Sequence, residues 1–320
     1  MPRFKVLLTD YAWPDLAIEQ AILSEAGIEL VVAPRQDEET LVELARDVDA
    51  IMTNWAKTTE RVIAAAPRCR IVSRLGIGLD NIAVDYCTSR GILVTNVPDY
   101  CIIEVAEHTL ALLLSLARKV AFYHAQTKSG RYALQEGPVL RRLEGQTLGI
   151  VGLGNIGAKI AQKAAALGMQ VVGYDLREPA AAEQVRRMNL GELLATSDYV
   201  SLHVPLTDKT RHLIGRKELA GMKPTAYLIN TARGGLVDPA ALADALANGK
   251  LAGAALDVQE PEPPDLSQPP YNDPRVIVTP HAAFASQESL ENLRSRTAKQ
   301  IVACLTGGSP ENVVNRSSLA

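Results

Sequence analysis

Short apolar runs alternate with segments of helical periodicity along almost the whole chain. In the first third of the sequence, the apolar runs predict strands at Lys5–Thr9, Glu29–Val32, Ala50–Thr53, Ile71–Arg74 and Leu93–Asn96. The segments between them predict helices at Pro14–Ala26, Glu39–Arg46, Thr59–Ala66 and Ile82–Arg90. Strands and helices that alternate in this way are typical of a parallel sheet with both faces covered.

A long helix is predicted next, from about Ile102 to His124. It is apolar on nearly every side, with leucines at Leu110, Leu112, Leu113, Leu114 and Leu116. We therefore expect it to be more buried than a surface helix. The stretch from Gly130 to Gly145 has no clear periodicity, which predicts an irregular connection between two units.

A second series of strands and helices starts at Thr147. Its predicted strands are Thr147–Val151, Gln170–Asp175, Tyr199–Val204, Ala226–Asn230, Ala252–Asp257 and Val276–Thr279. A last helix is predicted from Gln287 to Leu305, followed by a polar tail. Because 320 residues exceed one ordinary compact domain, the pattern predicts two parallel α/β units.

Composition and charge argue against a nucleic-acid-binding protein and against a membrane protein. The chain is 47% hydrophobic and 22% charged, as expected of a globular protein with a sizeable core. Its 33 basic and 36 acidic residues form no basic patch, so we expect no nucleic-acid partner. The longest strongly apolar stretch, Leu110–Ala117, is too short to span a membrane, and the N-terminal apolar run is too short for a signal peptide. The sequence therefore predicts a cytoplasmic protein without a membrane partner.

The cysteines offer no metal site. Their positions, Cys69, Cys87, Cys101 and Cys304, lack the short spacings of zinc or iron–sulfur ligands. In a reducing compartment such residues are usually buried thiols, so we expect that here and expect no bound metal.

A glycine-rich turn follows the first strand of the second series. Its sequence, Gly152-Leu153-Gly154-Asn155-Ile156-Gly157, fits the pattern of a dinucleotide-binding turn between a strand and a helix. Gly152 permits the tight turn, Gly154 lets the backbone approach a pyrophosphate, and Gly157 lets helix and strand pack closely. The helix predicted from Ile156 to Leu167, directly after Asn155, presents free N–H groups to the phosphates.

Asp175 ends the next strand, where an acidic side chain can bond both ribose hydroxyls. A carboxylate there disfavours a 2′-phosphate, so the sequence predicts NAD rather than NADP. Arg177 lies two residues further on and leaves an alternative open, because an arginine can bind that phosphate.

Three polar residues follow separate strands of the second series. Arg233 follows the strand that ends at Asn230. Glu262 follows the strand that ends at Asp257, and His281 follows the strand that ends at Thr279. Ligands of open parallel sheets bind outside the carboxyl ends of the strands, so all three are predicted at the cofactor edge.

These residue types suit hydride transfer to a 2-oxo acid. An arginine binds a carboxylate bidentately and keeps its charge, and a histidine titrates near working pH, so it can supply the proton. A neighbouring carboxylate favours the imidazolium and orients the ring. Taken singly, each also has an ordinary structural interpretation.

The remaining histidines are assigned different roles. His203, in His203-Val204-Pro205, stands at a strand end on the cofactor side and is a candidate for the adenine site, with Pro205. His108, His124 and His212 are interpreted as structural or surface residues.

Several motifs, in their order along the chain, resemble those of the D-isomer-specific 2-hydroxyacid dehydrogenase family. They are Arg74-Leu75-Gly76-Ile77-Gly78-Leu79-Asp80-Asn81, Asn96-Val97-Pro98-Asp99-Tyr100, the glycine turn, Asn230-Thr231-Ala232-Arg233-Gly234-Gly235, Ala254-Ala255-Leu256-Asp257-Val258 with Glu262-Pro263, and Thr279-Pro280-His281. Within that family, Pro98-Asp99-Tyr100-Cys101 and His281-Ala282-Ala283-Phe284 look closest to the C-terminal-binding-protein-like branch. That branch includes bacterial dehydrogenases and an animal corepressor.

The resemblance implies a Rossmann-type NAD-binding domain, residues 100–286, inserted into a flavodoxin-like α/β substrate domain, residues 1–99 with 287–320. It implies Arg233 as the substrate anchor, His281 as the acid/base and Glu262 as its partner. Asp257 would bond the nicotinamide carboxamide, and Thr231 and Ala232 would also contact the cofactor. Backbone N–H groups at Leu75, Gly76 and Ile77 would hold the substrate carboxylate. The helix around Glu107 to Val120 would form a homodimer interface.

The substrate prediction rests on the loop after the third strand. Phosphoglycerate dehydrogenases similar to this chain tend to carry an arginine there, whereas this chain has Thr53-Asn54-Trp55, with Lys57 displaced from that place. The sequence also stops at Ala320 without an added regulatory domain. Trp55, Tyr100 and Phe284 would give the pocket apolar walls, although each ring could equally pack the hinge.

We therefore expect an NAD-dependent dehydrogenase that transfers hydride between nicotinamide and C2 of a small, unphosphorylated D-2-hydroxy or 2-oxo acid. Two alternatives stay open at this point. One is a phosphoglycerate dehydrogenase, and the other is an NADH-sensing interaction protein that resembles the corepressor.

Overall fold

The computed structural model describes residues 3–177, 182 and 184–316. The chain divides into two compact units, Met1–Tyr100 with Ser286–Ala320 (unit 1) and Cys101–Ala285 (unit 2). Among the described helices, none combines the length and the apolar character that crossing a membrane would require.

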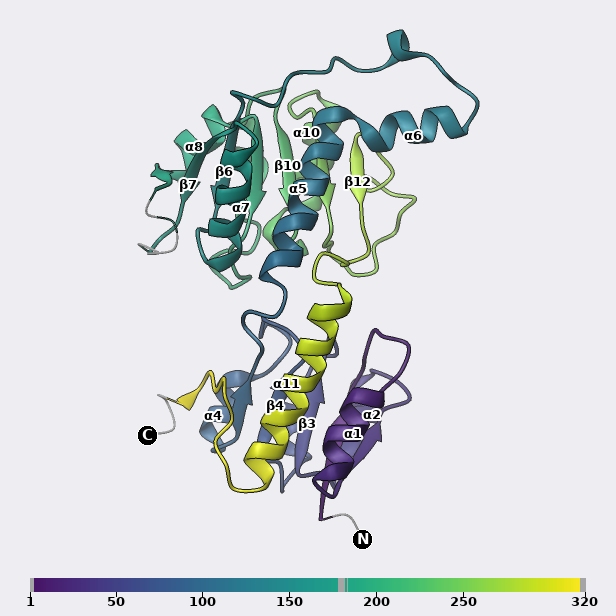
Figure 1. The fold of residues 1–320 in the computed structure, drawn as a ribbon, viewed down its shortest axis with the longest axis vertical. Coiled ribbons are helices and arrows are strands. Elements are labelled where there is room, and N and C mark those ends of the chain that lie inside the picture. The colour runs from purple at the N-terminus through teal and green to yellow at the C-terminus, as the bar shows by residue number, and fades with distance from the viewer. Residues whose placement is uncertain (1–2, 178–181, 183, 317–320) are drawn as a thin grey trace. The chain divides into compact units, whose positions relative to one another are not determined.

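Unit 1 contains a sheet of five parallel strands (Figure 1). The strands are β1 (Phe4–Leu8), β2 (Ile28–Val32), β3 (Ala50–Thr53), β4 (Ile71–Arg74) and β5 (Leu93–Thr95). Their order, β2-β1-β3-β4-β5, is that of a flavodoxin-like sheet. The helices are α1 (Ala17–Glu25), α2 (Glu38–Ala45), α3 (Glu60–Ala64), α4 (Val84–Ser89) and α11 (Gln287–Leu305).

Helix α11 completes the core of unit 1 although it comes from the far end of the sequence. Leu293 and Ile301 are buried in the same apolar cluster as Leu8 of β1. Arg294 of α11 donates to the carboxylate of Glu19 on α1 at 2.8 Å from two nitrogens, and Glu19 is fully buried. Apolar burial and a buried ion pair therefore both stabilise the packing of α11 in unit 1.

Unit 2 contains a sheet of seven parallel strands. They are β6 (Thr147–Val151), β7 (Gln170–Tyr174), β8 (Arg186–Arg187), β9 (Tyr199–Leu202), β10 (Tyr227–Asn230), β11 (Gly253–Leu256) and β12 (Val276–Val278). The order β12-β11-β10-β9-β6-β7-β8 contains the Rossmann order with one further strand, and it reverses between β6 and β9. Ligands of such sheets bind at the carboxyl ends of the strands that flank this reversal.

The α-helices of unit 2 are α5 (Ile102–Arg118), α6 (Val120–Lys128), α7 (Asn155–Ala166), α8 (Leu190–Thr196), α9 (Arg216–Ala220) and α10 (Pro239–Ala247), with short 3₁₀ turns η1 (Leu134–Glu136) and η3 (Gly234–Leu236). Helix α5 packs against α7, β10 and β11. The parallel α/β class predicted for both units is confirmed.

The single long helix predicted from Ile102 to His124 is wrong. Lys119 adopts a left-handed conformation, with φ of 55°, and separates α5 from α6. Its ammonium group donates to the Tyr227 hydroxyl at 2.7 Å and lies over the Tyr227 ring. These contacts stabilise Lys119 at the break between the helices. Helix α5 has eight buried residues, whereas α6 has none.

Candidate functional site

The glycine turn between β6 and α7 is close-packed at its first and last glycines and open in the middle. Gly152 has φ of 99°, and a Cβ there would lie 2.5 Å from the His203 carbonyl oxygen. A Cβ on Gly157 would lie 2.0 Å from the Gly152 carbonyl oxygen. At Gly154 an added Cβ would meet no atom within 4 Å. Space for a ligand therefore lies beside Gly154.

Helix α7 begins at Asn155, directly after this open position. The first N–H groups of a helix have no acceptor within the helix, and the positive end of the helix dipole adds to them. Asn155, Ile156 and Gly157 thus present donors of the kind that bind phosphate groups. The open glycine and the helix start together fit a dinucleotide.

Asp175 directly follows β7, beside the glycine turn. Its carboxylate accepts hydrogen bonds from the backbone N–H groups of Leu153 (2.8 Å) and Arg177 (2.9 Å). The guanidinium of Arg187 donates to the carbonyl oxygens of Asp175 (2.8 Å) and Arg177 (2.9 Å). The carboxylate is therefore held in place by the backbone of the turn, with cationic side chains nearby.

His203 and Pro205 follow β9, on the other side of the strand reversal. The His203 ring nitrogen Nε2 lies 2.7 Å from the Ser201 hydroxyl, and burial lowers the pKa of this histidine to about 3. The ring is consequently neutral at working pH. A neutral ring at this edge suits an adenine better than a phosphate.

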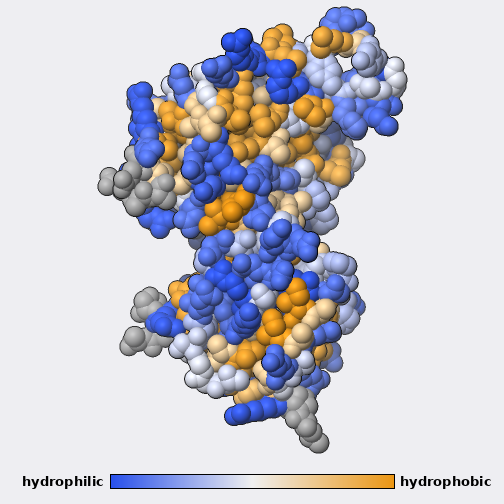
Figure 2. Space-filling view, in the orientation of Figure 1, coloured by the Kyte–Doolittle hydropathy of each residue, from blue (hydrophilic) through white to orange (hydrophobic). Residues whose placement is uncertain are grey.

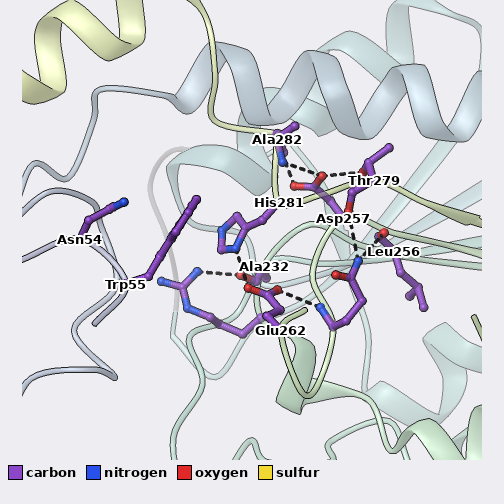
Figure 3. Close-up of polar contacts among 12 residues, drawn as sticks. Asn54, Trp55, Ala232, Leu256, Asp257, Glu262, Thr279, His281 and Ala282 are labelled. Atoms are coloured by element: carbon purple, nitrogen blue, oxygen red, sulfur yellow. Dashed lines mark hydrogen bonds and ion pairs between the residues drawn. The ribbon is translucent and has the colours of Figure 1, made fainter. Parts of the chain in front are cut away.

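His281 and Glu262 form a hydrogen-bonded pair (Figure 3). His281 Nδ1 lies 3.0 Å from Glu262 Oε2, and the second carboxylate oxygen of Glu262 accepts from the Gln259 backbone N–H at 2.9 Å. His281 has φ of 53°, and its backbone N–H donates to the Asp257 carbonyl oxygen at 2.8 Å. Backbone and side-chain bonds thus fix both members of the pair.

Asp257 is fully buried and holds the loop that carries His281. One carboxylate oxygen accepts from the Thr279 hydroxyl (2.5 Å) and from Ala282 N–H (2.9 Å), and the other accepts from Ala283 N–H (2.9 Å). Burial alone raises the pKa of Asp257, but these bonds and one from His108 outweigh it and lower the pKa to about 2. The residue is therefore a carboxylate at working pH.

This environment differs from the role that the resemblance implies for Asp257. Its side chain has 0% exposure and bonds to the Thr279 hydroxyl and the Ala282 N–H, so a nicotinamide carboxamide has no open access to it in this structure. The described geometry makes Asp257 a support for the His281 loop.

Replacing Asp257 with asparagine is expected to destabilise unit 2 in a pH-dependent way. A pKa lowered on folding stabilises the protein above the unfolded-state pKa, and this stabilisation is lost as pH falls through the folded-state value. The shift from 3.8 to about 2 corresponds to about 2 kcal/mol. Urea unfolding followed by circular dichroism gives the free energy of unfolding of each protein. The difference in this free energy between the wild-type protein and the variant should become smaller by about 2 kcal/mol between pH 5 and pH 2. A constant gap would contradict the assignment.

Arg233 lies in the turn after β10, at the start of η3. Its guanidinium donates to the Ala232 carbonyl oxygen at 2.7 Å, and the Asn230 amide donates to the Arg233 carbonyl oxygen at 2.8 Å. Gly234 packs on the loop after β11, because an added Cβ would lie 1.9 Å from the Gln259 carbonyl oxygen. Close packing thus joins the Arg233 turn to the loop that carries Glu262.

Thr231 and Ala232 belong to the same turn. The Thr231 hydroxyl lies 2.8 Å from the hydroxyl of Thr109 on α5, and Ala232 N–H donates to the Asn230 side chain at 3.1 Å. These bonds hold the turn against the sheet edge.

The predicted substrate-binding turn of unit 1 needs one correction. The Leu75 N–H donates to the Thr53 carbonyl oxygen at 2.8 Å, which excludes this N–H as a donor to a substrate carboxylate. Gly76 has φ of 156° and packs against the Arg74 guanidinium, which also donates to the Leu75 carbonyl oxygen. The Ile77 carbonyl oxygen accepts from Asn96 at 2.8 Å. The anion-binding prediction is thereby reduced to Gly76 and Ile77.

The aromatic residues predicted to wall the pocket differ in exposure. Trp55 is 40% exposed, whereas Tyr100 packs partly buried against the α11 side of the unit 1 core. Phe284 lies edge-on to the His281 ring, with 6.0 Å between the centroids. Within unit 1, Trp55 is the more exposed of the two rings.

Three residues near the candidate site are not predicted by any sequence motif. Asp10, after β1, accepts from the N–H groups of Asn54, Trp55 and Ala56. Gln259 donates from its amide to the carbonyl oxygens of Leu256 and Thr279, and so connects the ends of β11 and β12. His108 lies within bonding distance of the Thr279 hydroxyl and of the Asp257 carboxylate. For Asp10 and Gln259, the one sequence signal that could have predicted a role is their position directly after a strand.

The comparisons with known proteins agree with this architecture. A family model described as D-isomer specific 2-hydroxyacid dehydrogenase, NAD binding domain, matches residues 110–283. A D-3-phosphoglycerate dehydrogenase of Methanocaldococcus jannaschii is 40% identical over 98% of the chain, which spans 60% of that relative's length. A glyoxylate reductase of Thermococcus litoralis is 39% identical over 87% of each sequence. The solved D-lactate dehydrogenase from Aquifex aeolicus, complexed with NAD and lactic acid, has a TM-score of 0.86 and 31% identity, over 95% of this chain and 96% of that one.

The family model covers more than half of the chain, and the glyoxylate reductase matches most of the length of both proteins. That the chain is most similar to the C-terminal-binding-protein-like branch of the family stays a prediction. The chain belongs to the D-isomer-specific 2-hydroxyacid dehydrogenase family, which comprises NAD-dependent oxidoreductases.

Proposed function

We propose that the chain reduces small, unphosphorylated 2-oxo acids with NADH and catalyses the reverse oxidation of D-2-hydroxy acids. The His281–Glu262 pair, 3.0 Å apart in a unit with the Rossmann strand order, is the observation that carries the proposal. The glyoxylate reductases and the D-lactate dehydrogenase among the relatives act on substrates of this class.

In the proposed reduction, the dinucleotide held at the glycine turn would supply the hydride that reduces the carbonyl carbon C2. His281 gives a proton to the oxygen that becomes the hydroxyl group, and it takes that proton back in the oxidation. Since Glu262 engages Nδ1, we assign the transferred proton to Nε2. The carboxylate of Glu262 stabilises the imidazolium that must form in the oxidation.

Arg233 is assigned to the substrate carboxylate, because its planar guanidinium binds a carboxylate through two parallel hydrogen bonds. Gly76 and Ile77 of unit 1 would add backbone donors. Residues 1–99 with 287–320 would then form the substrate domain, and residues 100–286 the cofactor domain.

The cofactor is assigned to the loops after the strands of unit 2. The residues proposed to hold it are Gly152, Gly154, Asn155, Ile156, Gly157, Asp175, His203, Pro205, Thr231 and Ala232. Supporting this set, Gly154 is open and the neighbouring helix start offers N–H donors.

The preference for an unphosphorylated substrate rests on the loop after β3. Three consecutive N–H groups there, from Asn54 to Ala56, already bond to the buried Asp10 carboxylate. A phosphate near this carboxylate would meet like charge and a heavy desolvation cost. An apolar chain instead gains about 0.8 kcal/mol for each buried methylene.

The test is a panel of 2-oxo acids with NADH and purified protein. We expect glyoxylate, hydroxypyruvate or a medium aliphatic or thioether acid to have a higher kcat/KM than phosphohydroxypyruvate. A clear preference for phosphohydroxypyruvate would make the chain a phosphoglycerate dehydrogenase and move the phosphate contact to Lys57. Tight NADH binding without turnover would favour the sensor alternative.

NADH is expected to be preferred over NADPH by about tenfold or more in kcat/KM, since a loss of 1.4 kcal/mol is already tenfold. The carboxylate of Asp175, fixed by two backbone N–H groups, would repel a 2′-phosphate. Steady-state rates with both cofactors check this expectation. Equal rates would show that Arg177 or Arg187 overrides the carboxylate, and Asp175→Asn should then have little effect on the ratio.

The proposal includes a homodimer formed through unit 2. Tyr132 and Val139 are 94% and 83% exposed, and Val120 and Leu134 are also exposed. Figure 2 shows hydrophobic residues over the middle of unit 2, where Figure 1 places α5. Apolar side chains gathered in this way commonly mark an interface.

Light scattering with size-exclusion chromatography tests the dimer. The wild-type protein should have twice the chain mass of 34.4 kDa. The double variant Tyr132→Asp, Val139→Asp should approach the mass of one chain, because it places charges at two exposed apolar positions in the connection after α6. An unchanged mass of the variant would place the interface elsewhere.

A cytoplasmic location, consistent with the four free, buried cysteines, completes the proposal.

A further inference from the structure

His108 on α5 lies against the loop that carries His281. Its Nε2 is 3.1 Å from the Thr279 hydroxyl oxygen and 3.4 Å from Asp257 Oδ1. The side chain is 25% exposed. The sequence suggests only a structural or surface role for His108, but in the structure its ring is directed at the carboxylate that supports the proposed acid/base.

The hydrogen-bond pattern fixes the direction of donation. The Thr279 hydroxyl has one hydrogen, and it donates that hydrogen to Asp257 Oδ1 at 2.5 Å. Thr279 can therefore only accept from His108. A histidine that donates through Nε2 carries its hydrogen on that nitrogen, so the ring acts as a donor to both oxygens.

The same carboxylate holds the backbone on the C-terminal side of His281. It accepts from Ala282 N–H and Ala283 N–H, both at 2.9 Å. Thr279, on the other side of Pro280, donates its backbone N–H to the Leu256 carbonyl oxygen at 3.0 Å. The loop between these anchors holds His281 at φ of 53°, a left-handed conformation that is uncommon for residues other than glycine.

We propose that His108 is a positioning residue for His281, acting through Thr279 and Asp257 as a hydrogen-bond donor from α5. This inference rests on the proposed function, in which His281 is the acid/base. Without the donor, Asp257 and Thr279 lose one fixed contact and the loop can shift. A small displacement of a catalytic group lowers kcat more than it weakens substrate binding.

Three substitutions at one position separate the donor from the bulk of the ring. His108→Gln retains an N–H donor at nearly the distance of Nε2, His108→Asn is a shorter amide, and His108→Leu has no donor. We expect kcat to fall about tenfold in the leucine and asparagine variants, the scale of one hydrogen bond to a charged group. The glutamine variant should remain close to the wild-type kcat, and KM for NADH should change little in all three.

A matched control removes a different contact of α5. Lys163→Gln breaks an ion pair of 2.9 Å between α7 and Glu107 of α5, next to His108 in the sequence. This variant should retain the wild-type kcat. A fall in kcat equal to that of His108→Leu would show that loosening α5 suffices, and would overturn the proposal.

Hydrogen exchange provides a readout that does not depend on turnover. Peptides containing Ala282 and Ala283 should exchange faster in the leucine and asparagine variants than in the glutamine variant and the wild-type protein. Equal exchange in all four proteins overturns the inference, as does an equal kcat in the leucine and glutamine variants. A wild-type protein that reduces no 2-oxo acid contradicts the proposed function instead, and the exchange data then decide whether His108 holds the loop.

Discussion

Replacing His281 with alanine is expected to lower kcat for 2-oxo acid reduction by about 10²–10⁴, the usual scale for a lost acid/base. The variant lacks the group that hydrogen-bonds Glu262 at 3.0 Å and exchanges the proton. The glycine turn after β6 is untouched, so the Kd for NADH should remain close to that of the wild-type protein. Steady-state kinetics and a fluorescence titration with NADH measure the two quantities.

Glu262→Gln provides a graded comparison for this prediction. Its single amide oxygen can accept from His281 Nδ1 only if the amide NH2 takes the place of the oxygen that accepts from the Gln259 N–H, and the negative charge is gone. We expect a smaller loss of kcat than in His281→Ala, because the histidine that exchanges the proton is still present, although its charge stabilisation and one of the two hydrogen bonds are lost. An alanine variant of His281 that keeps most of the wild-type kcat would remove this histidine from the reaction.

Replacing Gly234 with alanine should reduce kcat/KM by about 10² or more, the effect of displacing a catalytic group by about 1 Å. The new Cβ would lie 1.9 Å from the Gln259 carbonyl oxygen and 2.1 Å from its carbon. These are backbone atoms, so they cannot rotate away as a side chain does. The Arg233 turn must therefore separate from the loop that holds Glu262.

Gly191→Ala is the matched control for this substitution. Gly191 lies in the first turn of α8, where an added Cβ would be 3.5 Å from an Asn189 side-chain oxygen, an ordinary contact. This variant should keep wild-type kcat/KM and Tm, because alanine favours the helix. Wild-type kinetics in Gly234→Ala would show that the two loops do not need their close packing.

The central strands were predictable because every residue in them is buried, as in β3, β4, β9 and β11. Such strands form continuous apolar runs, and β1 and β3 lie within a residue of the predicted Lys5–Thr9 and Ala50–Thr53. The short strand β8 was missed, because Arg186 and Arg187 at the sheet edge are exposed and polar. The break at Lys119 was missed as well, since no glycine or proline marks it.

The candidate site was predictable only where a residue follows a strand in a known motif. His281 and Glu262 satisfy that condition, and the structure pairs them. His108 does not, because it lies in the middle of an apolar helix and meets Thr279 from 171 positions away. The contact becomes visible only when α5 is packed against β10 and β11.

The course of the chain through unit 1 has a consequence for its synthesis. Helix α11 brings Leu293 and Ile301 into the core of unit 1, and Arg294 to the buried Glu19, but a ribosome releases this helix only after all of unit 2. Unit 2 can fold as soon as β12 has emerged, whereas the nascent first hundred or so residues wait with an apolar face uncovered. Throughout that interval Glu19 lacks its cation, and an uncompensated carboxylate opposes burial of the surrounding surface. Translation order therefore leaves the N-terminal segment with an incomplete core until α11 has been synthesised.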